Sequence, residues 1–97
     1  MRHATKLVVN DMVRFWAFLF FGVVMLSVPK HRRLLGEAIR ATRKKAGFSQ
    51  EKLAEKADLS TVFISRIERG VESPSVDNLV KIAKALRVRV RDLVYQF

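Results

Sequence analysis

Few side chains in this sequence could carry out covalent or metal chemistry. It has no cysteine, which excludes disulfides, thiolate metal sites and a thiol nucleophile. The two histidines, His3 and His31, lie far apart and have no neighbour at ligand spacing, so no metal site is expected. A glycine-rich phosphate loop and a nucleophile elbow are also absent. The sequence therefore predicts neither an enzyme nor a cofactor.

The chemistry that the sequence does favour is binding to a polyanion. Its 97 residues hold 19 Lys and Arg against 9 Asp and Glu, a formal net charge of +10. Residues 30–97 contain 16 of the basic and 8 of the acidic residues, so the positive charge belongs mainly to this part. An excess of this size is typical of proteins that bind nucleic acid or an anionic membrane surface.

The chain divides into two segments at Pro29. Residues 1–29 form an apolar N-terminal extension, in which residues 15–26 read FWAFLFFGVVML without a polar side chain. Residues 30–97 show helical periodicity almost throughout and no strand-like alternation of any length. We therefore expect an all-α domain of four or five short helices, preceded by an apolar helical extension.

Helix start and stop signals divide residues 30–97 further. Serines stand where N-caps are needed, and glycines stand where helices should end. The expected helices are one from about Leu35 to Ala46, ended by Gly47; 50–57, capped by Ser49; 61–69, capped by Ser60 and ended by Gly70; 76–86, after the turn Ser73-Pro74-Ser75; and a short one at 88–94. The apolar stripe expected on 76–86 consists of Val76, Leu79, Ile82, Ala83 and Leu86.

Helices 50–57 and 61–69 are joined by so few residues that they form a helix-turn-helix. The stretch SQEKLAEKADLSTVFISRIERG resembles the lambda-repressor-like (Cro/XRE-type) helix-turn-helix family. The matching positions are Gln50, Leu53, Ala54, Leu59, Ser60, Ile64, Ser65, Ile67, Glu68 and Gly70. SPSVDNLVKIAKALRV resembles the family's fourth helix, so the resemblance covers about residues 33–95. It implies a prokaryotic or phage transcriptional regulator that binds specific sequences in double-stranded DNA.

The resemblance also implies which residues contact bases. The family's base-contacting positions correspond to Thr61, Val62, Ser65 and Arg66, on the outward side of the helix at 61–69. An arginine can donate two hydrogen bonds to guanine O6 and N7, worth about 1–3 kcal/mol of discrimination. The methyl groups of Thr61 and Val62 can contact a thymine methyl group. The alternative for Arg66 is an ordinary solvated helix arginine.

A second set of residues is expected to contact the DNA backbone. Phosphate contacts are expected from Gln50, Ser60, Phe63, Arg43, Lys44, Ser73 and Ser75. Two of the assignments have alternatives. Phe63 could be a core residue, and the basic residues 43–45 could simply complement the dipole at a helix C-terminus. In this family, moreover, an arginine at the position of Arg43 commonly pairs with the glutamate that matches Glu68, which implies a partly buried ion pair.

The sequence departs from the family pattern at two turns. Asp58 stands where the turn between the helix-turn-helix helices usually has Gly, and Arg87 stands where Gly or Asn often follows the fourth helix. If both residues are left-handed, each costs about 1–2 kcal/mol relative to Gly, and Asp costs less. We expect replacement of either by Gly to be neutral or stabilising.

One such domain makes too few contacts for a specific site, and dimers on half-sites about 34 Å apart are the usual solution. Val90, Val94, Tyr95 and Phe97 form an apolar C-terminal edge that could be a homodimer contact or could cap the core. The sequence shows no sensor domain and implies no small-molecule ligand. The main rival function is an antitoxin-type protein-interaction module, although few residues follow the last helix to bind a toxin.

Three hypotheses remain for residues 1–29. Met25 could start a shorter working protein, in which case residues 1–24 are a dispensable leader, and this interpretation is favoured. Residues 12–28 could instead anchor the chain in an inner membrane, although a helix of that length spans about 26 Å of the roughly 30 Å required. Finally, the segment could be an oligomerisation helix. The expected location is the cytoplasm, at the nucleoid, with a membrane tether left open.

Overall fold

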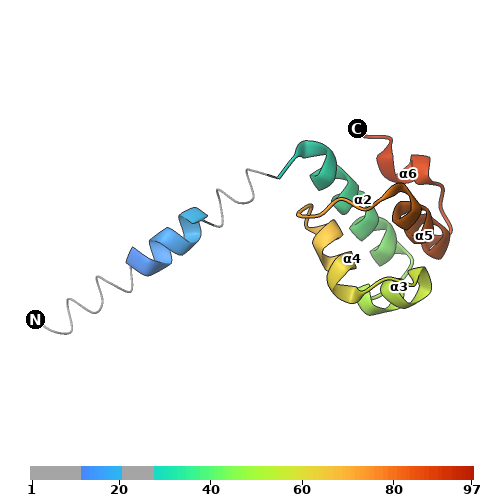
Figure 1. Cartoon of the computed structure of the whole chain (residues 1–97), viewed down its shortest axis with the longest axis horizontal. Coiled ribbons are helices and arrows are strands. Elements are labelled where there is room, and N and C mark those ends of the chain that lie inside the picture. The colour runs from blue at the N-terminus through green and yellow to red at the C-terminus, as the bar shows by residue number, and fades with distance from the viewer. Residues whose placement is uncertain (1–11, 21–27) are drawn as a thin grey trace, which may run out of the picture.

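A computed structural model describes residues 12–20 and 28–97, and all regular secondary structure in these ranges is α-helical. A helix at residues 12–20 precedes the domain (Figure 1). The domain contains α2 (Lys30–Lys45), α3 (Gln50–Ala57), α4 (Thr61–Glu68), α5 (Val76–Leu86) and α6 (Val90–Val94). The predicted all-α fold is confirmed, and the predicted bounds 50–57 and 76–86 agree with α3 and α5.

The helix starts are set by three serine caps. Ser49, Ser60 and Ser75 each accept a hydrogen bond from the backbone N–H three residues further on, at 3.0, 3.0 and 3.1 Å. Such a cap stabilises a helix by about 1 kcal/mol, because it satisfies a donor that the helix leaves open. α2 has no side-chain cap after Pro29 and begins five residues before the apolar positions from which it was predicted.

The core is aliphatic and lies between α2, α3, α4 and α5, with α6 covering one end. α2 packs against α4 and α6, and α3 packs against α4 and α5 (Figure 1). The buried apolar residues are Leu35, Ile39, Leu53, Ala54, Ala57, Ile64, Ile67, Ile82, Ala83, Leu86 and Leu93. Val76 was wrongly placed on the buried stripe of α5. Its side chain is 76% exposed because it lies in the first turn, beyond the edge of the core.

Both turns that depart from the family pattern are left-handed. Asp58 has φ 56° and Arg87 has φ 57°, and each is the C-cap of its helix. The chain needs only residues 58–60 to connect α3 with α4, because the left-handed residue reverses its direction directly after α3. Gly47 and Gly70 take the same conformation after α2 and α4, as their placement in the sequence predicts.

The N-terminal hypotheses are only partly covered by the structure. No helix in residues 12–20 and 28–97 is both long and apolar enough to cross a membrane. The proposed anchor at 12–28 includes residues 21–27, and the proposed start at Met25 falls within them. These residues and residues 1–11 lie outside the described ranges, so the three hypotheses stay predictions.

Candidate nucleic-acid interface

The two faces of α4 differ completely in exposure. Ile64, Ile67 and Glu68 are buried against the rest of the domain. The residues expected to contact bases lie on the other face, where Val62 is 60% exposed and the Arg66 side chain is 55% exposed. Thr61 and Ser65 are partly exposed. An α-helix with its side chains is about 10–12 Å in diameter and fits a major groove about 12 Å wide.

The inner face of α4 lies against α2 at a point where the two backbones nearly touch. Gly36, in the middle of α2, is buried, and a Cβ atom there would lie 2.4 Å from the carbonyl oxygen of Ile67 and 2.5 Å from that of Glu68. Only a residue without a side chain permits this approach. Gly36 therefore sets the separation of α2 and α4.

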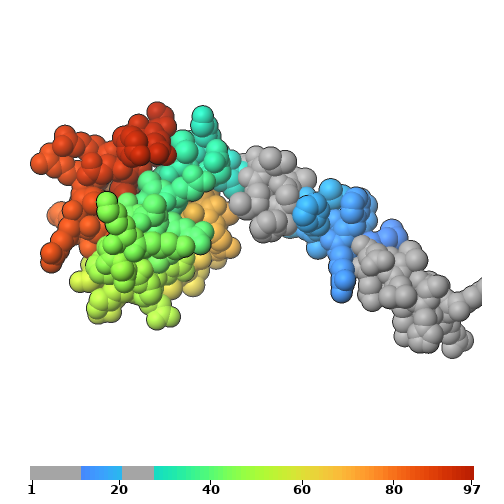
Figure 2. Space-filling model, turned by 180° about the vertical axis from the view of Figure 1, so that it is seen from behind, coloured from blue at the N-terminus to red at the C-terminus, as the bar shows by residue number. Residues whose placement is uncertain are grey.

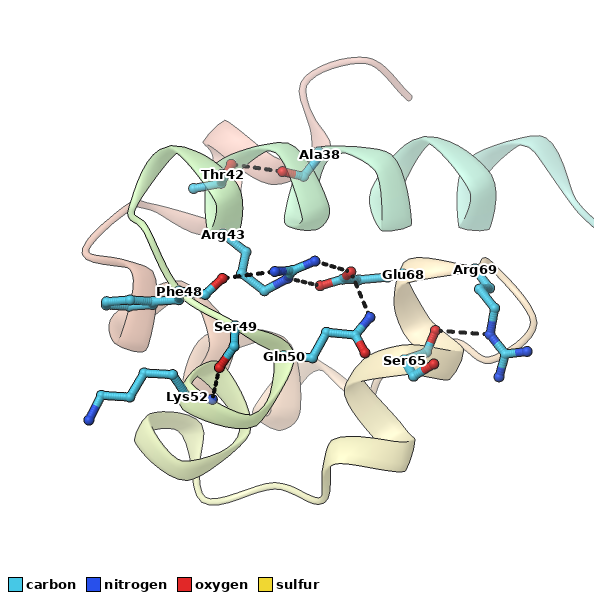
Figure 3. Close-up of polar contacts among 10 residues, drawn as sticks. All are labelled: Ala38, Thr42, Arg43, Phe48, Ser49, Gln50, Lys52, Ser65, Glu68 and Arg69. Atoms are coloured by element: carbon cyan, nitrogen blue, oxygen red, sulfur yellow. Dashed lines mark hydrogen bonds and ion pairs between the residues drawn. The ribbon is translucent and has the colours of Figure 1, made fainter.

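A buried polar cluster fixes the orientation of α4 (Figure 3). The Glu68 carboxylate accepts hydrogen bonds from Arg43 Nε at 2.6 Å, Arg43 Nη2 at 3.0 Å and Gln50 Nε2 at 3.1 Å. Arg43 Nη1 also donates to the Phe48 carbonyl at 2.8 Å. The Arg43 and Glu68 side chains are only 10% and 2% exposed. The cluster thus joins α2, the start of α3 and the end of α4 through one bidentate ion pair and its neighbours.

The burial of Arg43 changes its expected role. Its three guanidinium nitrogens all donate to protein acceptors, and the residue is 8% exposed. A phosphate group could reach this guanidinium only if the ion pair opened, which would leave the Glu68 carboxylate buried without its partner. We therefore remove Arg43 from the phosphate-contacting set and keep it in the structural ion pair.

Arg66 has a loosely held partner on the outer face. Its Nη1 lies 3.9 Å from Oε2 of Glu72, in the loop between α4 and α5. That oxygen is buried and accepts no hydrogen bond from the residues that the structure describes. A pair at this distance, with half-exposed side chains, contributes little to stability. The pair holds the Arg66 guanidinium near the other residues that are expected to contact bases. At this distance the guanidinium N–H groups form no hydrogen bond with Glu72.

Three of the seven residues expected to contact phosphates, Gln50, Ser60 and Ser75, lie at helix N-termini. Ser60 and Ser75 use Oγ as the acceptor in their caps, so each hydroxyl hydrogen is free to donate outward. Gln50 donates one of its two amide hydrogens to Glu68 and retains the other. The first N–H groups of α3 and α4 point out of the helix ends and favour an anion.

The remaining expected phosphate contacts differ in their surroundings. Ser73 and Lys44 are exposed. Phe63 is partly buried and packs against the core, which supports the core alternative for this residue. We therefore do not assign Phe63 to the DNA backbone.

Sequence reasoning missed Gly36 and Glu72. A glycine inside a helical pattern is itself a signal of close packing, and this one was available in the sequence. Glu72 had a weaker signal, since it is an acidic residue two positions after Gly70, in a loop expected to face DNA. Its proximity to Arg66 follows only from how the chain turns after α4.

Comparison with known proteins identifies this arrangement. A family model described as helix-turn-helix matches residues 39–93, more than half of the chain. The control protein C.BamHI of Bacillus amyloliquefaciens is 48% identical over 64 residues, covering 65% of this chain and 79% of that protein. Several other curated relatives are longer, and the chain spans 38% to 42% of their length.

Solved structures show the same fold. The restriction-modification controller protein C.AhdI from Aeromonas hydrophila superposes with a TM-score of 0.63 at 34% identity, over 64% of this chain and 94% of that one. The P22 c2 repressor, solved in complex with a synthetic operator, superposes with a TM-score of 0.60 at 39% identity, over 63% and 92%. This chain belongs to the lambda-repressor-like (Cro/XRE-type) helix-turn-helix family of DNA-binding transcriptional regulators.

Proposed function

We propose that the protein inserts α4 into the major groove and reads base edges with Thr61, Val62, Ser65 and Arg66. The observation that carries this proposal is the sharp contrast between the two faces of α4. The inner face is buried and ion-paired, whereas the outer face exposes Val62, which is not part of the core, and Arg66, whose partner oxygen on Glu72 lies 3.9 Å away. An exposed row of small, methyl-bearing and guanidinium side chains suits the donor, acceptor and methyl pattern of the major groove.

The backbone contacts would then hold α4 in register. Gln50, Ser60 and Ser75 stand at the starts of α3, α4 and α5, where open N–H groups and hydroxyl donors favour phosphate oxygens. Ser73 and Lys44 complete the proposed set, which omits Arg43 and Phe63. Such contacts carry no sequence information but make affinity fall steeply with salt.

We also propose that the working unit is a homodimer on a palindromic operator. Tyr95 and Phe97 are 73% and 61% exposed at the C-terminal edge, next to the half-buried Val90 and Val94. The Phe97 ring meets that of His31, in α2, at 6.2 Å between centroids. The C-terminal segment lies beside α2 in the space-filling view (Figure 2). A two-fold contact through it would bury aromatic surface that the monomer leaves in water.

A narrower role is favoured by two of the comparisons. The relative matched at 48% identity is named a control protein, and C.AhdI is named a restriction-modification controller. A controller of a restriction-modification system is therefore our second candidate. It predicts that the selected operator lies next to genes for a methyltransferase or restriction endonuclease in the source genome, and an operator elsewhere would count against it. Either role places the domain in the cytoplasm with the chromosome and requires no enzymatic activity.

Selection of binding sites from a random DNA pool tests the proposal. The full chain should enrich a palindrome whose half-site centres are about 34 Å, one helical turn, apart. Sedimentation of the protein on that site should give two chains per duplex. If no motif is enriched and binding only weakens with salt, the protein is a non-specific basic binder and the proposal is wrong.

A further inference from the structure

The helix at residues 12–20 exposes more large apolar surface than any other element in the described ranges. The exposed fractions of Phe15, Trp16, Phe18 and Phe20 are 60%, 63%, 74% and 72%. Met12 and Val13 are also more than half exposed. The apolar sequence continues beyond the helix as far as Leu26. Exposure of so much apolar surface to water is unfavourable, so we expect this segment to be buried against a lipid or protein partner.

The apolar surface surrounds the helix. With successive residues about 100° apart, the nine side chains cover the full circumference, and Arg14 is the only charged residue among them. A partner protein that packs along one stripe would leave the opposite side in water. A helix that is apolar all round is typical of a lipid environment or of the centre of a large protein core. The core of the described domain consists of small and aliphatic side chains between Leu35 and Leu93 and does not enclose this helix.

The DNA-binding fold does not need this helix. The family model begins at residue 39, and the C.AhdI structure is matched over 94% of its own length by 64% of this chain. The buried core of the domain contains no residue before Leu35. Residues 12–20 therefore do not take part in the fold of the domain.

The basic residues that follow the apolar segment indicate which kind of lipid surface it would bind. α2 begins with Lys30, Arg32 and Arg33, and its first acidic residue is Glu37. Lys30 and Arg33 are exposed, and Arg32 is partly exposed. Basic residues directly after an apolar segment favour anionic headgroups on the cytoplasmic side. We propose that residues 12–20 insert into an anionic lipid bilayer and that Lys30, Arg32 and Arg33 bind its headgroups, so that the DNA-binding domain is held at a membrane surface.

The chain enters the domain at the end of α4 that lies opposite Thr61 and Val62. A Cβ atom on Gly70 would lie 2.9 Å from Val28, so the chain enters the domain beside the C-terminal end of α4. Thr61 and Val62 lie at the opposite end of that helix. A bilayer next to Val28 would therefore lie away from Thr61 and Val62 and nearer to Arg66, which is in the last turn of α4.

Flotation with lipid vesicles tests the proposal. The full chain, purified in mild detergent and reconstituted by detergent removal, should float with vesicles of phosphatidylglycerol and phosphatidylcholine. The double variant Phe18→Glu/Phe20→Glu should stay at the bottom of the gradient, whereas Phe18→Leu/Phe20→Leu should float like the wild type. Both variants should keep the wild-type melting temperature and bind duplex DNA in solution, because the altered residues lie outside the domain.

A second arm tests the headgroup contacts. Replacing Lys30 or Arg32 by Gln should weaken binding to anionic vesicles roughly fivefold per charge and leave binding to pure phosphatidylcholine unchanged. Equal flotation of the double Glu variant and the wild type would show that only the general charge of the domain attracts lipid, and would overturn the proposal. A wild-type chain that pellets as aggregate, or that forms a defined oligomer and ignores the vesicles, would overturn it as well.

Discussion

The inner and outer faces of α4 contain similar residue types that do different work. Each has a charged side chain with an oppositely charged partner from another part of the chain. Glu68, on the inner face, is 2% exposed and accepts three hydrogen bonds, whereas Arg66, on the outer face, has one partner atom at 3.9 Å. The first pair holds the helix in place, and the second leaves a donor available. Burial therefore separates the structural pair from the residue that we propose to read DNA.

The largest effect should follow from breaking the inner pair. Glu68→Ala leaves the Arg43 guanidinium buried without its carboxylate, which should cost about 3–5 kcal/mol of unfolding free energy. Thermal unfolding should then shift by more than 10 °C, since about 4–8 °C corresponds to 1 kcal/mol in a domain of this size. Glu37→Ala is the control; it removes only an exposed ion pair with Arg33, at 3.4 Å, and should lower the melting temperature by no more than about 4 °C. A shift below 1 °C in Glu68→Ala would show that the pair is not structural.

Adding a side chain at the close contact between α2 and α4 should have the next largest effect. Gly36→Ala adds a Cβ atom that meets two backbone carbonyls, so the helices must separate, at a cost of about 1–3 kcal/mol or somewhat more. Because α4 would tilt, DNA affinity should fall in the same variant even where it is fully folded. Urea unfolding and DNA titration measure the two effects. Wild-type values in both would contradict the role given to Gly36.

Truncation of Arg66, on the outer face of α4, should leave the free energy of unfolding almost unchanged and weaken DNA binding. Arg66→Ala should reduce affinity for the selected operator by about 5- to 150-fold, equivalent to 1–3 kcal/mol. Lys81→Ala, which also removes one exposed positive charge, is the matched control and should lose less. Fluorescence anisotropy with labelled duplex gives both values. Equal losses in the two variants would mean that Arg66 acts only through its charge.

Smaller changes are expected at the left-handed turns that follow α3 and α5. Arg87→Gly relieves a left-handed arginine and should stabilise the domain by up to about 1 kcal/mol, because the relief exceeds the extra freedom gained by the unfolded chain. Asp58→Gly should change stability by less than about 0.5 kcal/mol, since Asp tolerates this conformation. Chemical denaturation measures the free energy of unfolding of each variant and shows which of the two is more stable. Clear destabilisation by either variant would show that its turn is built differently.

The smallest effect should come from the partner of Arg66. Glu72→Gln removes a negative charge beside the base-contacting row, and operator affinity should rise by about two- to fivefold, within the range of an exposed pair. The gain should shrink at high salt. A loss of affinity would show instead that Glu72 orients Arg66 toward its base.

Local features of this chain could be predicted from its sequence. The caps at Ser49, Ser60 and Ser75, and the bounds of α3 and α5, follow from residue types within one helical turn. The burial of Arg43, the contact between Gly36 and α4, and the approach of Glu72 to Arg66 depend on how distant segments pack. The resemblance to a known family supplied the Arg43–Glu68 pair, which no pattern in the residues alone could have indicated. It did not show that this pair takes Arg43 away from DNA.

The most direct test of base reading by the outer face is a change in the preferred sequence. Site selection is run in parallel with the full chain and with Arg66→Ala. If Arg66 binds guanine, the variant should lose preference for guanine at one symmetric position in each half-site and keep the rest of the motif. An unchanged motif in the variant would contradict the central claim that Arg66 on α4 reads the DNA.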